Sequence, residues 1–243
     1  MVGDPVRIVT WNLQGSKLKD VAGVSEQLKA FDADIVCFQE VQRRQFRSIS
    51  AAAGMRGNWT LKHWPLRRPA EGIATMSRLR IKSSSAKPIS RREQLWSWRR
   101  RVASATSIEF DGADLHIVNT HLGAGVTEGE RAAQAHRLVA QFSGIDFIVG
   151  DMNVRPDSDV LKVFAQLRDS WEMLGPEQDR PHTNWEPGPR SAPPVQCLDY
   201  VFVAPSWQVV RFDVPQDWRE FAALSDHLPV IVDVVKEPDA TVI

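Results

Sequence analysis

The sequence predicts an α+β domain with sheets inside and helices outside. Short strand-like runs recur from one end of the chain to the other. Helical patterns separate only some of these runs, and Asp111-Gly112 joins two others as the tight turn of a hairpin. Strands joined both by helices and by tight turns favour a layered α+β arrangement over a purely parallel, doubly wound sheet.

Eight runs have the length and pattern of strands. In chain order they are Val6–Asn12, Asp34–Glu40, Glu71–Met76, Val102–Phe110, Leu115–His121, Asp146–Asp151, Leu198–Val203 and Leu228–Val235. Three helices are expected, at Lys17–Phe31, Thr127–Phe142 and Asp157–Leu167, and the second opens with the capping-box pattern Thr127-x-x-Glu130. The Pro-rich stretch Glu186–Pro194 is interpreted as a surface loop, so residues 1–243 are expected to form a single domain.

Composition narrows the class of protein. The chain has 243 residues, of which 43% are hydrophobic and 25% charged, and this excludes disordered, collagenous and coiled-coil proteins. Cys37 and Cys197 are isolated, so a reducing compartment, the cytoplasm, is the default expectation. The sequence lacks a signal-peptide core and an apolar run of about 18 residues, so we expect a soluble protein without a membrane span, by default a monomer.

The net charge of zero conceals an asymmetry along the chain. Residues 1–110 carry 20 Lys and Arg against 9 Asp and Glu, whereas residues 111–243 carry 10 against 21. Such a division is compatible with a basic surface for a polyanion beside an acidic cluster that holds cations, although it can also average out in the folded chain.

Polar residues stand where several of the predicted strands end. They are Asn12, Glu40, His121, Asp151, Asn153, Asp199, Asp226 and His227. Any one of them alone is explained by turn capping or a structural hydrogen bond. Together they supply the oxygen ligands that Mg²⁺ prefers, with histidines for charge stabilisation or proton transfer at a phosphoryl centre.

Six short blocks in this order resemble the metal-dependent endonuclease/exonuclease/phosphatase superfamily, which includes DNase I-like and exonuclease III-like nucleases. They are Val9-Thr10-Trp11-Asn12, Asp34–Glu40, Asn119-Thr120-His121-Leu122, Gly150-Asp151-Met152-Asn153, Leu198–Phe202 and Ser225–Val230. The resemblance implies a DNase I-like, four-layered α/β/β/α sandwich with two mostly antiparallel sheets packed face to face.

The resemblance also implies roles for individual residues. Glu40 would be the principal ligand of Mg²⁺ or Mn²⁺, with Asp226 and Asn12 beside it, and one or two ions could bind. Asp151 would orient and deprotonate the attacking water, although His227 is an alternative base. The other expected catalytic residues are Asn153 and His121 at the phosphate and Asp199, which would fix the tautomer of His227.

A segment rich in arginine and tryptophan lies at residues 91–101, outside the six blocks. Arginine forks to phosphates and tryptophan stacks on bases, so these residues are candidate substrate contacts. They are Trp96, Trp98, Arg99, Arg100 and Arg101. The alternative is a solvated basic loop whose tryptophans pack inward.

The leading hypothesis is a Mg²⁺-dependent phosphodiesterase that hydrolyses nucleic acid, DNA more than RNA, by in-line attack of water. One alternative is the same chemistry on a phospholipid or inositol phosphate, and another is a non-catalytic nucleic-acid-binding module. Abasic-site repair is disfavoured, because that branch uses a separate mid-chain tyrosine and Tyr200 is the only tyrosine here.

Overall fold

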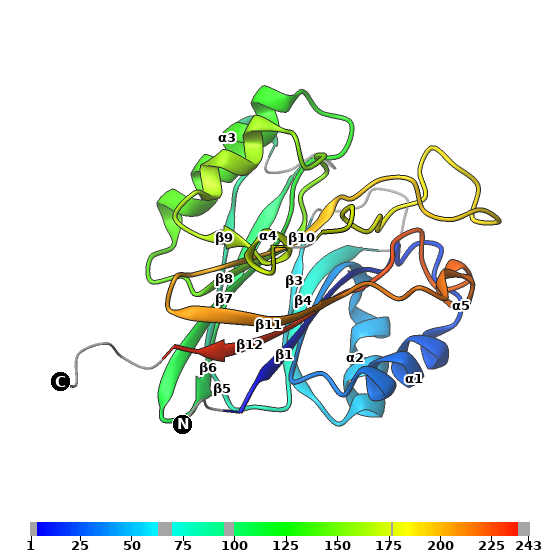
Figure 1. Ribbon diagram of the computed structural model, residues 1–243, viewed down its shortest axis with the longest axis horizontal. Coiled ribbons are helices and arrows are strands. Elements are labelled where there is room, and N and C mark those ends of the chain that lie inside the picture. Colours follow the sequence, from blue (N-terminus) through cyan, green and yellow to red (C-terminus); the bar gives the residue numbers. More distant parts are fainter. Residues whose placement is uncertain (1–3, 63–69, 95–99, 176, 238–243) are drawn as a thin grey trace.

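The structure, a computed structural model, describes residues 4–62, 70–94, 100–175 and 177–237. In these residues the strands form two sheets of six strands each, and helices flank the pair (Figure 1). The predicted α/β/β/α sandwich is therefore confirmed.

The first sheet has the strand order β11-β12-β1-β2-β4-β3. Only β1 and β2 run parallel, and every other neighbouring pair is antiparallel. Its strands are β1 (Val6–Asn12), β2 (Ile35–Gln42), β3 (Arg56–Leu61), β4 (Glu71–Ser77), β11 (Trp207–Asp213) and β12 (Val230–Lys236). The first and last parts of the chain thus lie side by side in one sheet.

The second sheet has the order β5-β6-β7-β8-β10-β9, and again a single central pair, β7 and β8, is parallel. Asp111 and Gly112 join β6 to β7 with φ values of 49° and 75°, as a type I′ turn requires. The strands are β5 (Ile81–Pro88), β6 (Val102–Phe110), β7 (Ala113–His121), β8 (Phe147–Asp151), β9 (Arg168–Asp169) and β10 (Asp199–Val203).

Helices cover the outer faces of the two sheets. The first helix begins at Val21 rather than Lys17, because the Asp20 carboxylate accepts a hydrogen bond from Gly23 N and caps it. The predicted helix Asp157–Leu167 is instead a 3₁₀ helix, Asp159–Phe164, whose turns close on residues three apart, as Ala165 N does on Lys162 O. The α-helices are α1 (Val21–Phe31), α2 (Arg43–Ala53), α3 (Glu128–Gln141), α4 (Ser170–Met173) and α5 (Trp218–Ala222).

Two hydrophobic clusters hold the layers together. The larger contains buried residues of both sheets and of α1 and α2, among them Trp11, Phe38 and Phe147. The smaller lies between the second sheet and α3, where Leu138 packs with Ile148 and Phe202. Residues 1–110 contribute strands to both sheets, so the charge asymmetry of the sequence is not an asymmetry between sheets. No helix of the described residues is long and apolar enough to cross a membrane.

Candidate active site

The polar strand ends meet at one edge of the two sheets. Asn12 at the end of β1 donates from Nδ2 to Asp151 Oδ2 at the end of β8, at 2.9 Å. Within the second sheet, Asp151 pairs with His121 of β7 on one side and with Asp199 of β10 on the other. The edge where both central parallel pairs end therefore gathers residues from both halves of the chain.

These side chains surround one cavity of about 340 Å³. Seven of the eight polar residues expected at the site line it: Asn12, Glu40, His121, Asp151, Asn153, Asp226 and His227. Asp199, the eighth, is completely buried behind His227. The structure thus brings together the whole set of predicted catalytic and metal-binding residues.

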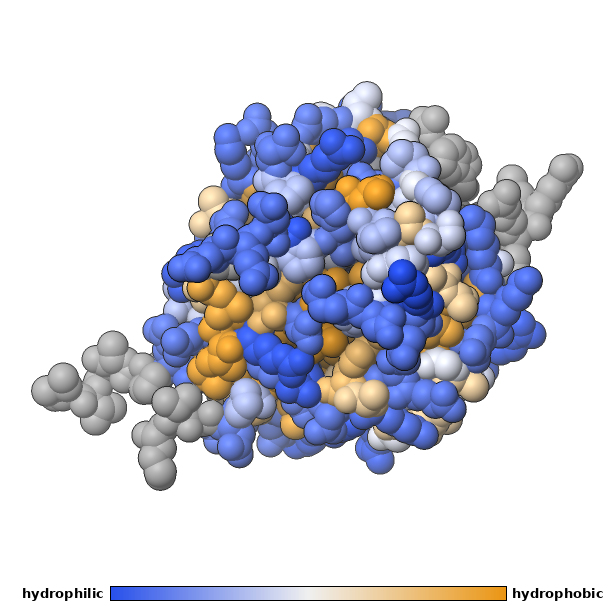
Figure 2. All heavy atoms as spheres, turned by 45° about the vertical axis from the view of Figure 1, so that its right-hand side comes forward, coloured by the Kyte–Doolittle hydropathy of each residue, from blue (hydrophilic) through white to orange (hydrophobic). Residues whose placement is uncertain are grey.

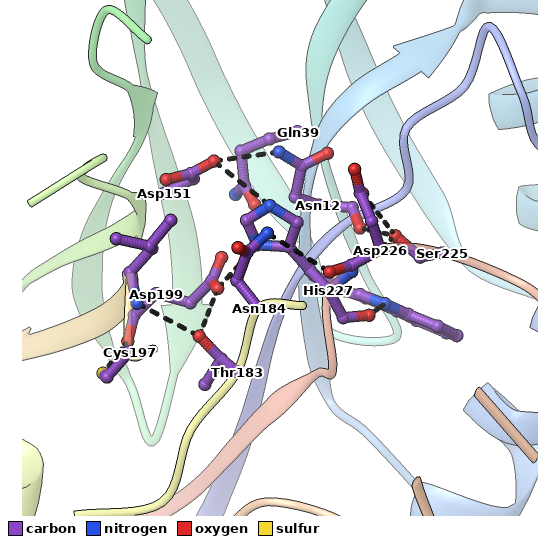
Figure 3. A network of polar contacts seen from close by, with 12 residues as sticks. Asn12, Gln39, Asp151, Thr183, Asn184, Cys197, Asp199, Ser225, Asp226 and His227 are labelled. Carbon is purple, nitrogen blue, oxygen red and sulfur yellow. Dashed lines mark hydrogen bonds and ion pairs between the residues drawn. The ribbon is translucent and has the colours of Figure 1, made fainter. Parts of the chain in front are cut away.

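His227 lies between two carboxylates (Figure 3). Its Nδ1 is 2.8 Å from Asp199 Oδ2, and its Nε2 is 3.8 Å from Asp151 Oδ2. Burial alone would lower the pKa of His227, but the charges of Asp199 and Asp151 outweigh it and raise that pKa above its usual value. The two carboxylates therefore favour the protonated imidazole, whose Nε2 side lies toward Asp151 and the cavity.

Asp151 is held by two hydrogen bonds in addition to its neighbouring charges. Oδ2 accepts from Asn12, and Oδ1 accepts from the backbone N–H of Asn153 at 2.9 Å. Burial raises the pKa of Asp151, and the charge of Asp199 adds to the rise while His227 opposes it. A carboxylate whose proton affinity is raised by burial has the property that a general base needs.

Glu40 reaches the cavity from a bulge in β2. The register of β2 against β4 shifts between Phe38 and Val41, and Glu40 has a φ of 55°, which non-glycine residues rarely adopt. Asn153 has a φ of 52° in the same region of the map. Such backbone conformations concentrate at functional sites, where they aim a side chain that regular strand geometry would point elsewhere.

A buried lysine and a histidine both approach the same carboxylate oxygen of Glu40. Lys62 Nζ is 2.9 Å from Glu40 Oε1, and His121 Nδ1 is 3.8 Å from the same oxygen. His121 Nε2 lies 3.5 Å from Asp151 Oδ2, so this ring stands between the two carboxylates. Burial raises the pKa of Glu40, but Lys62, through its charge and hydrogen bond, together with the charges of His227 and Arg101, lowers it overall. Glu40 is thus a carboxylate anion at neutral pH.

Asp226 faces the cavity from the segment before β12. Gln14 donates from Nε2 to Asp226 Oδ2 and from its backbone N to Asn12 Oδ1, while Arg190 of the Pro-rich loop donates to Gln14 Oε1. Burial raises the pKa of Asp226, and the charge of Arg190 acts against the rise. Gln14 therefore fixes two of the three residues predicted to bind metal.

The donor set at the cavity suits a divalent cation. Glu40, Asp226 and Asn12 offer oxygen ligands, the type that Mg²⁺ and Mn²⁺ take from proteins. Among the described residues, Asp151, Asp199 and His227 form the group whose ligand atoms lie within 4.8 Å of one another. That group could hold a metal ion, but the hydrogen bond between His227 and Asp199 engages two of its members. Glu40, Asp226 and Asn12 are engaged in the same way, by Lys62 and Gln14.

Thr183 and Lys62 contact the candidate site residues, and the sequence analysis missed both. Thr183 Oγ1 donates to Asp199 Oδ2 at 2.7 Å and accepts from Leu198 N at 3.1 Å (Figure 3). Neither residue belongs to a run of alternating or helical periodicity, and neither ends a predicted strand. Only their positions in space identify them, because Thr183 comes from an irregular segment and Lys62 directly follows β3.

The predicted substrate-binding segment is described only in part. Arg101 is buried, lies within the electrostatic reach of Glu40 and Asp151, and donates from Nε to Leu122 O at 3.4 Å. Arg100 is half-buried beside it. Trp96, Trp98 and Arg99 lie outside the described residues, so their predicted roles stay predictions.

Comparison with known proteins establishes the family. Residues 9–227 match the model of the endonuclease/exonuclease/phosphatase family, and the chain belongs to that family. Its members are hydrolases, both nucleases and phosphatases. No curated protein matches the sequence at a significant level.

Solved structures share the fold at low sequence identity. The human Nocturnin catalytic domain with bound sulfate is 23% identical, with a TM-score of 0.75, over 95% of this chain and 94% of that one. TDP2 from D. rerio, complexed with a single-strand DNA product, is 19% identical with a TM-score of 0.72, over 96% and 99%. A mannosyl-6-phosphatase from Bacteroides thetaiotaomicron is 18% identical with a TM-score of 0.72, over 95% and 99%.

Proposed function

We propose that this protein is a divalent-metal-dependent phosphodiesterase that hydrolyses nucleic acid, DNA more than RNA. The observation that carries the proposal is the convergence of Asp151, His121, His227 and Glu40 on one cavity at the junction of the two sheets. A site of this composition can activate water, bind a cation and stabilise charge on a phosphoryl group. A non-catalytic module would have no need to keep the whole set together.

In the proposed reaction one group of residues holds the cation and another residue activates water. Glu40, Asp226 and Asn12 would hold Mg²⁺ or Mn²⁺, which supplies Lewis-acid stabilisation of phosphate oxygens when bound. Asp151 accepts the proton of the water that attacks phosphorus in line with the leaving oxygen. Asn12 keeps Asp151 aimed at that water through the 2.9 Å hydrogen bond to Oδ2.

Charge that develops on phosphorus is met by cationic and polar groups. His227, kept protonated by Asp199, stabilises a nonbridging oxygen from Nε2. His121 donates to the phosphate from the side of Glu40. The Asn153 side chain donates to Leu122 O at 3.0 Å, so its orientation at the edge of the cavity is fixed. Arg101 adds positive charge behind the site.

Nucleic acid is favoured as the substrate by two kinds of support. The arginines of the first two turns of α2, Arg43, Arg44 and Arg47, are exposed directly after the β2 strand that carries Glu40. Positive charges that begin three residues after Glu40 attract a polyanion. The similar fold of TDP2, which was solved with a single-strand DNA product, also supports a nucleic-acid substrate.

A small polar phosphoester is the second candidate. A cavity of about 470 Å³ adjoins the catalytic one and shares Asn153, Gln196 and Leu198 with it. Its lining combines the carboxylates of Glu128, Asp157 and Asp159 with the guanidinium groups of Arg131 and Arg155. Donors and acceptors of both charges suit a hydroxyl-rich group, and the fold of the mannosyl-6-phosphatase agrees with this candidate.

A phospholipid substrate has less support. The large hydrophobic side chains that are exposed among the described residues are Leu174, Val195 and Val210. On the face shown in Figure 2, apolar residues form limited patches within a mostly hydrophilic surface. A membrane-acting enzyme presents a larger continuous apolar area.

The test is cleavage of end-labelled single-stranded DNA, double-stranded DNA and RNA, with Mg²⁺ or with excess EDTA. Asp151→Asn removes the proposed base, and Asp213→Asn makes the same change at a remote ion pair with Arg211. We expect metal-dependent cutting that Asp151→Asn abolishes and Asp213→Asn leaves intact, and the ladder separates endo from exo action. Cleavage of a sugar phosphate, an inositol phosphate or vesicle phospholipid, but of no nucleic acid, would contradict the proposed substrate.

A further inference from the structure

Lys62 is an unusual residue to find at this site, because its side chain is buried. Its side chain is 3% exposed, and lysine is almost never buried to this degree unless it is paired. The ammonium group lies 2.9 Å from Glu40 Oε1 and 3.7 Å from Glu71 Oε2. It thus occupies a position between two carboxylates, which is the position that a metal cation would also favour.

The backbone fixes this position. Lys62 directly follows β3, and its N–H donates to Glu71 O at 3.0 Å, which continues the pairing of β3 with β4. Glu71 is held in turn by Ser16 N, which donates to Oε1 at 2.8 Å. The pairing of β3 with β4 therefore fixes the backbone of Lys62, and its buried side chain places the ammonium next to Glu40.

One ammonium group and two carboxylates form this cluster, and their charges affect the binding of a cation. Lys62 is the positive partner of two carboxylates, and the charge of Glu40 raises the pKa of Glu71 together with burial, the larger cause. A cation that binds Glu40 must come close to the ammonium, and the two positive charges repel strongly in a site that excludes most water. Without the ammonium, two neighbouring carboxylates would attract the cation together.

We propose that Lys62 is an internal counter-ion that competes with the divalent cation for Glu40 and thereby weakens cation binding at the site. This inference rests on the assignment of Glu40 as a metal ligand in the proposed function. Lys62 is a positioning residue in this account, since it acts through the Glu40 carboxylate. Its ammonium holds Oε1 of the Glu40 carboxylate, and a cation that binds either oxygen must do so against the repulsion of that charge.

The experiment is a calorimetric titration of the full chain with Mn²⁺, without substrate. Lys62→Met removes the charge at similar length, and Lys62→Arg keeps the charge. Lys82→Met is the matched control, because Lys82 forms an exposed ion pair with Asp114. We expect Lys62→Met to bind Mn²⁺ about tenfold more tightly than the wild type. Lys62→Arg and Lys82→Met should stay within about threefold of it.

The same titration separates the inference from its premise. Glu40→Gln should weaken Mn²⁺ binding by about 100-fold, and an unchanged affinity in that variant would refute the metal assignment itself. If Glu40→Gln weakens binding but Lys62→Met binds as the wild type does, or less tightly, Lys62 only orients Glu40 and the competition is refuted. Circular dichroism melts confirm that each variant is folded, and Lys62→Gln, which also lacks the charge, replaces Lys62→Met if the latter does not fold.

Discussion

Replacing Thr183 by valine isolates the contribution of one hydroxyl to the Asp199–His227 pair. Thr183 and Asp199 are both fully buried. The hydroxyl donates to Asp199 Oδ2 and accepts from Leu198 N, and Asp199 Oδ1 has no hydrogen-bond partner among the described residues. Thr183 is therefore the side chain that holds Asp199 in place beside His227.

The expected cost follows from these two hydrogen bonds. A hydrogen bond to a charged group contributes about 1.5–3 kcal/mol, and a buried N–H left without an acceptor costs about 1–3 kcal/mol. The free energy of unfolding of Thr183→Val should thus fall by about 3–5 kcal/mol. With Asp199 free to turn, the orientation of His227 is less well defined, and kcat should fall by about 10–100-fold.

Urea denaturation and steady-state kinetics on the same preparations provide the assay. Thr183→Ser retains the hydroxyl and should recover most of both losses. Thr106→Val is the matched control, because Thr106 is buried in β6 but donates only to the neutral Asn58 Oδ1, at 3.3 Å. It should lose about 1 kcal/mol of stability and keep full activity. If Thr183→Val behaves like Thr106→Val in both measurements, the proposed support of Asp199 is wrong.

Two further predictions concern stability. Burial raises the pKa of the Cys37 thiol to about 12, whereas an unfolded thiol titrates near 9. Stability from the neutral thiol is full below about pH 9 and is lost as the pH rises toward 12, by about 1.4 kcal/mol per unit. The wild type should therefore lose more stability than Cys37→Ala between pH 9 and 11 in urea titrations, and parallel losses would contradict the burial argument. Gly150→Ala should prevent folding or greatly lower the melting temperature, because Gly150 has a φ of 139° and a Cβ there would lie 1.9 Å from Thr120 O; a variant that melts like the wild type would refute this steric argument.

Strand positions were predictable because their periodicity is local. The expected ranges Val6–Asn12 and Val102–Phe110 coincide with β1 and β6. The strands that the sequence analysis missed are β3, β5, β9 and β11. β5 has seven exposed residues among its eight, so it lacks the apolar alternation that identifies a strand. It is a strand because β6 pairs with it, which is a tertiary effect.

The site was predictable to the extent that its residues end strands. Asn12, His121 and Asp151 are the last residues of β1, β7 and β8, so the packing of the two sheets brings them to one edge. Lys62 and Thr183 could not be found in this way, because a buried charge pair and a hydroxyl in an irregular segment have no local pattern. Their importance depends on distances to Glu40 and Asp199 that only the folded chain determines.

The most direct test of the account is hydrolysis of bis(p-nitrophenyl) phosphate, a diester without a base or a lipid, by the wild type, Glu40→Gln and Asp151→Asn. The account predicts turnover that requires Mg²⁺ or Mn²⁺, stops in EDTA and falls by at least about 1,000-fold in both folded variants. Turnover that persists in EDTA, or variants that match the wild type, would contradict the claim that these two carboxylates at the junction of the sheets perform the hydrolysis.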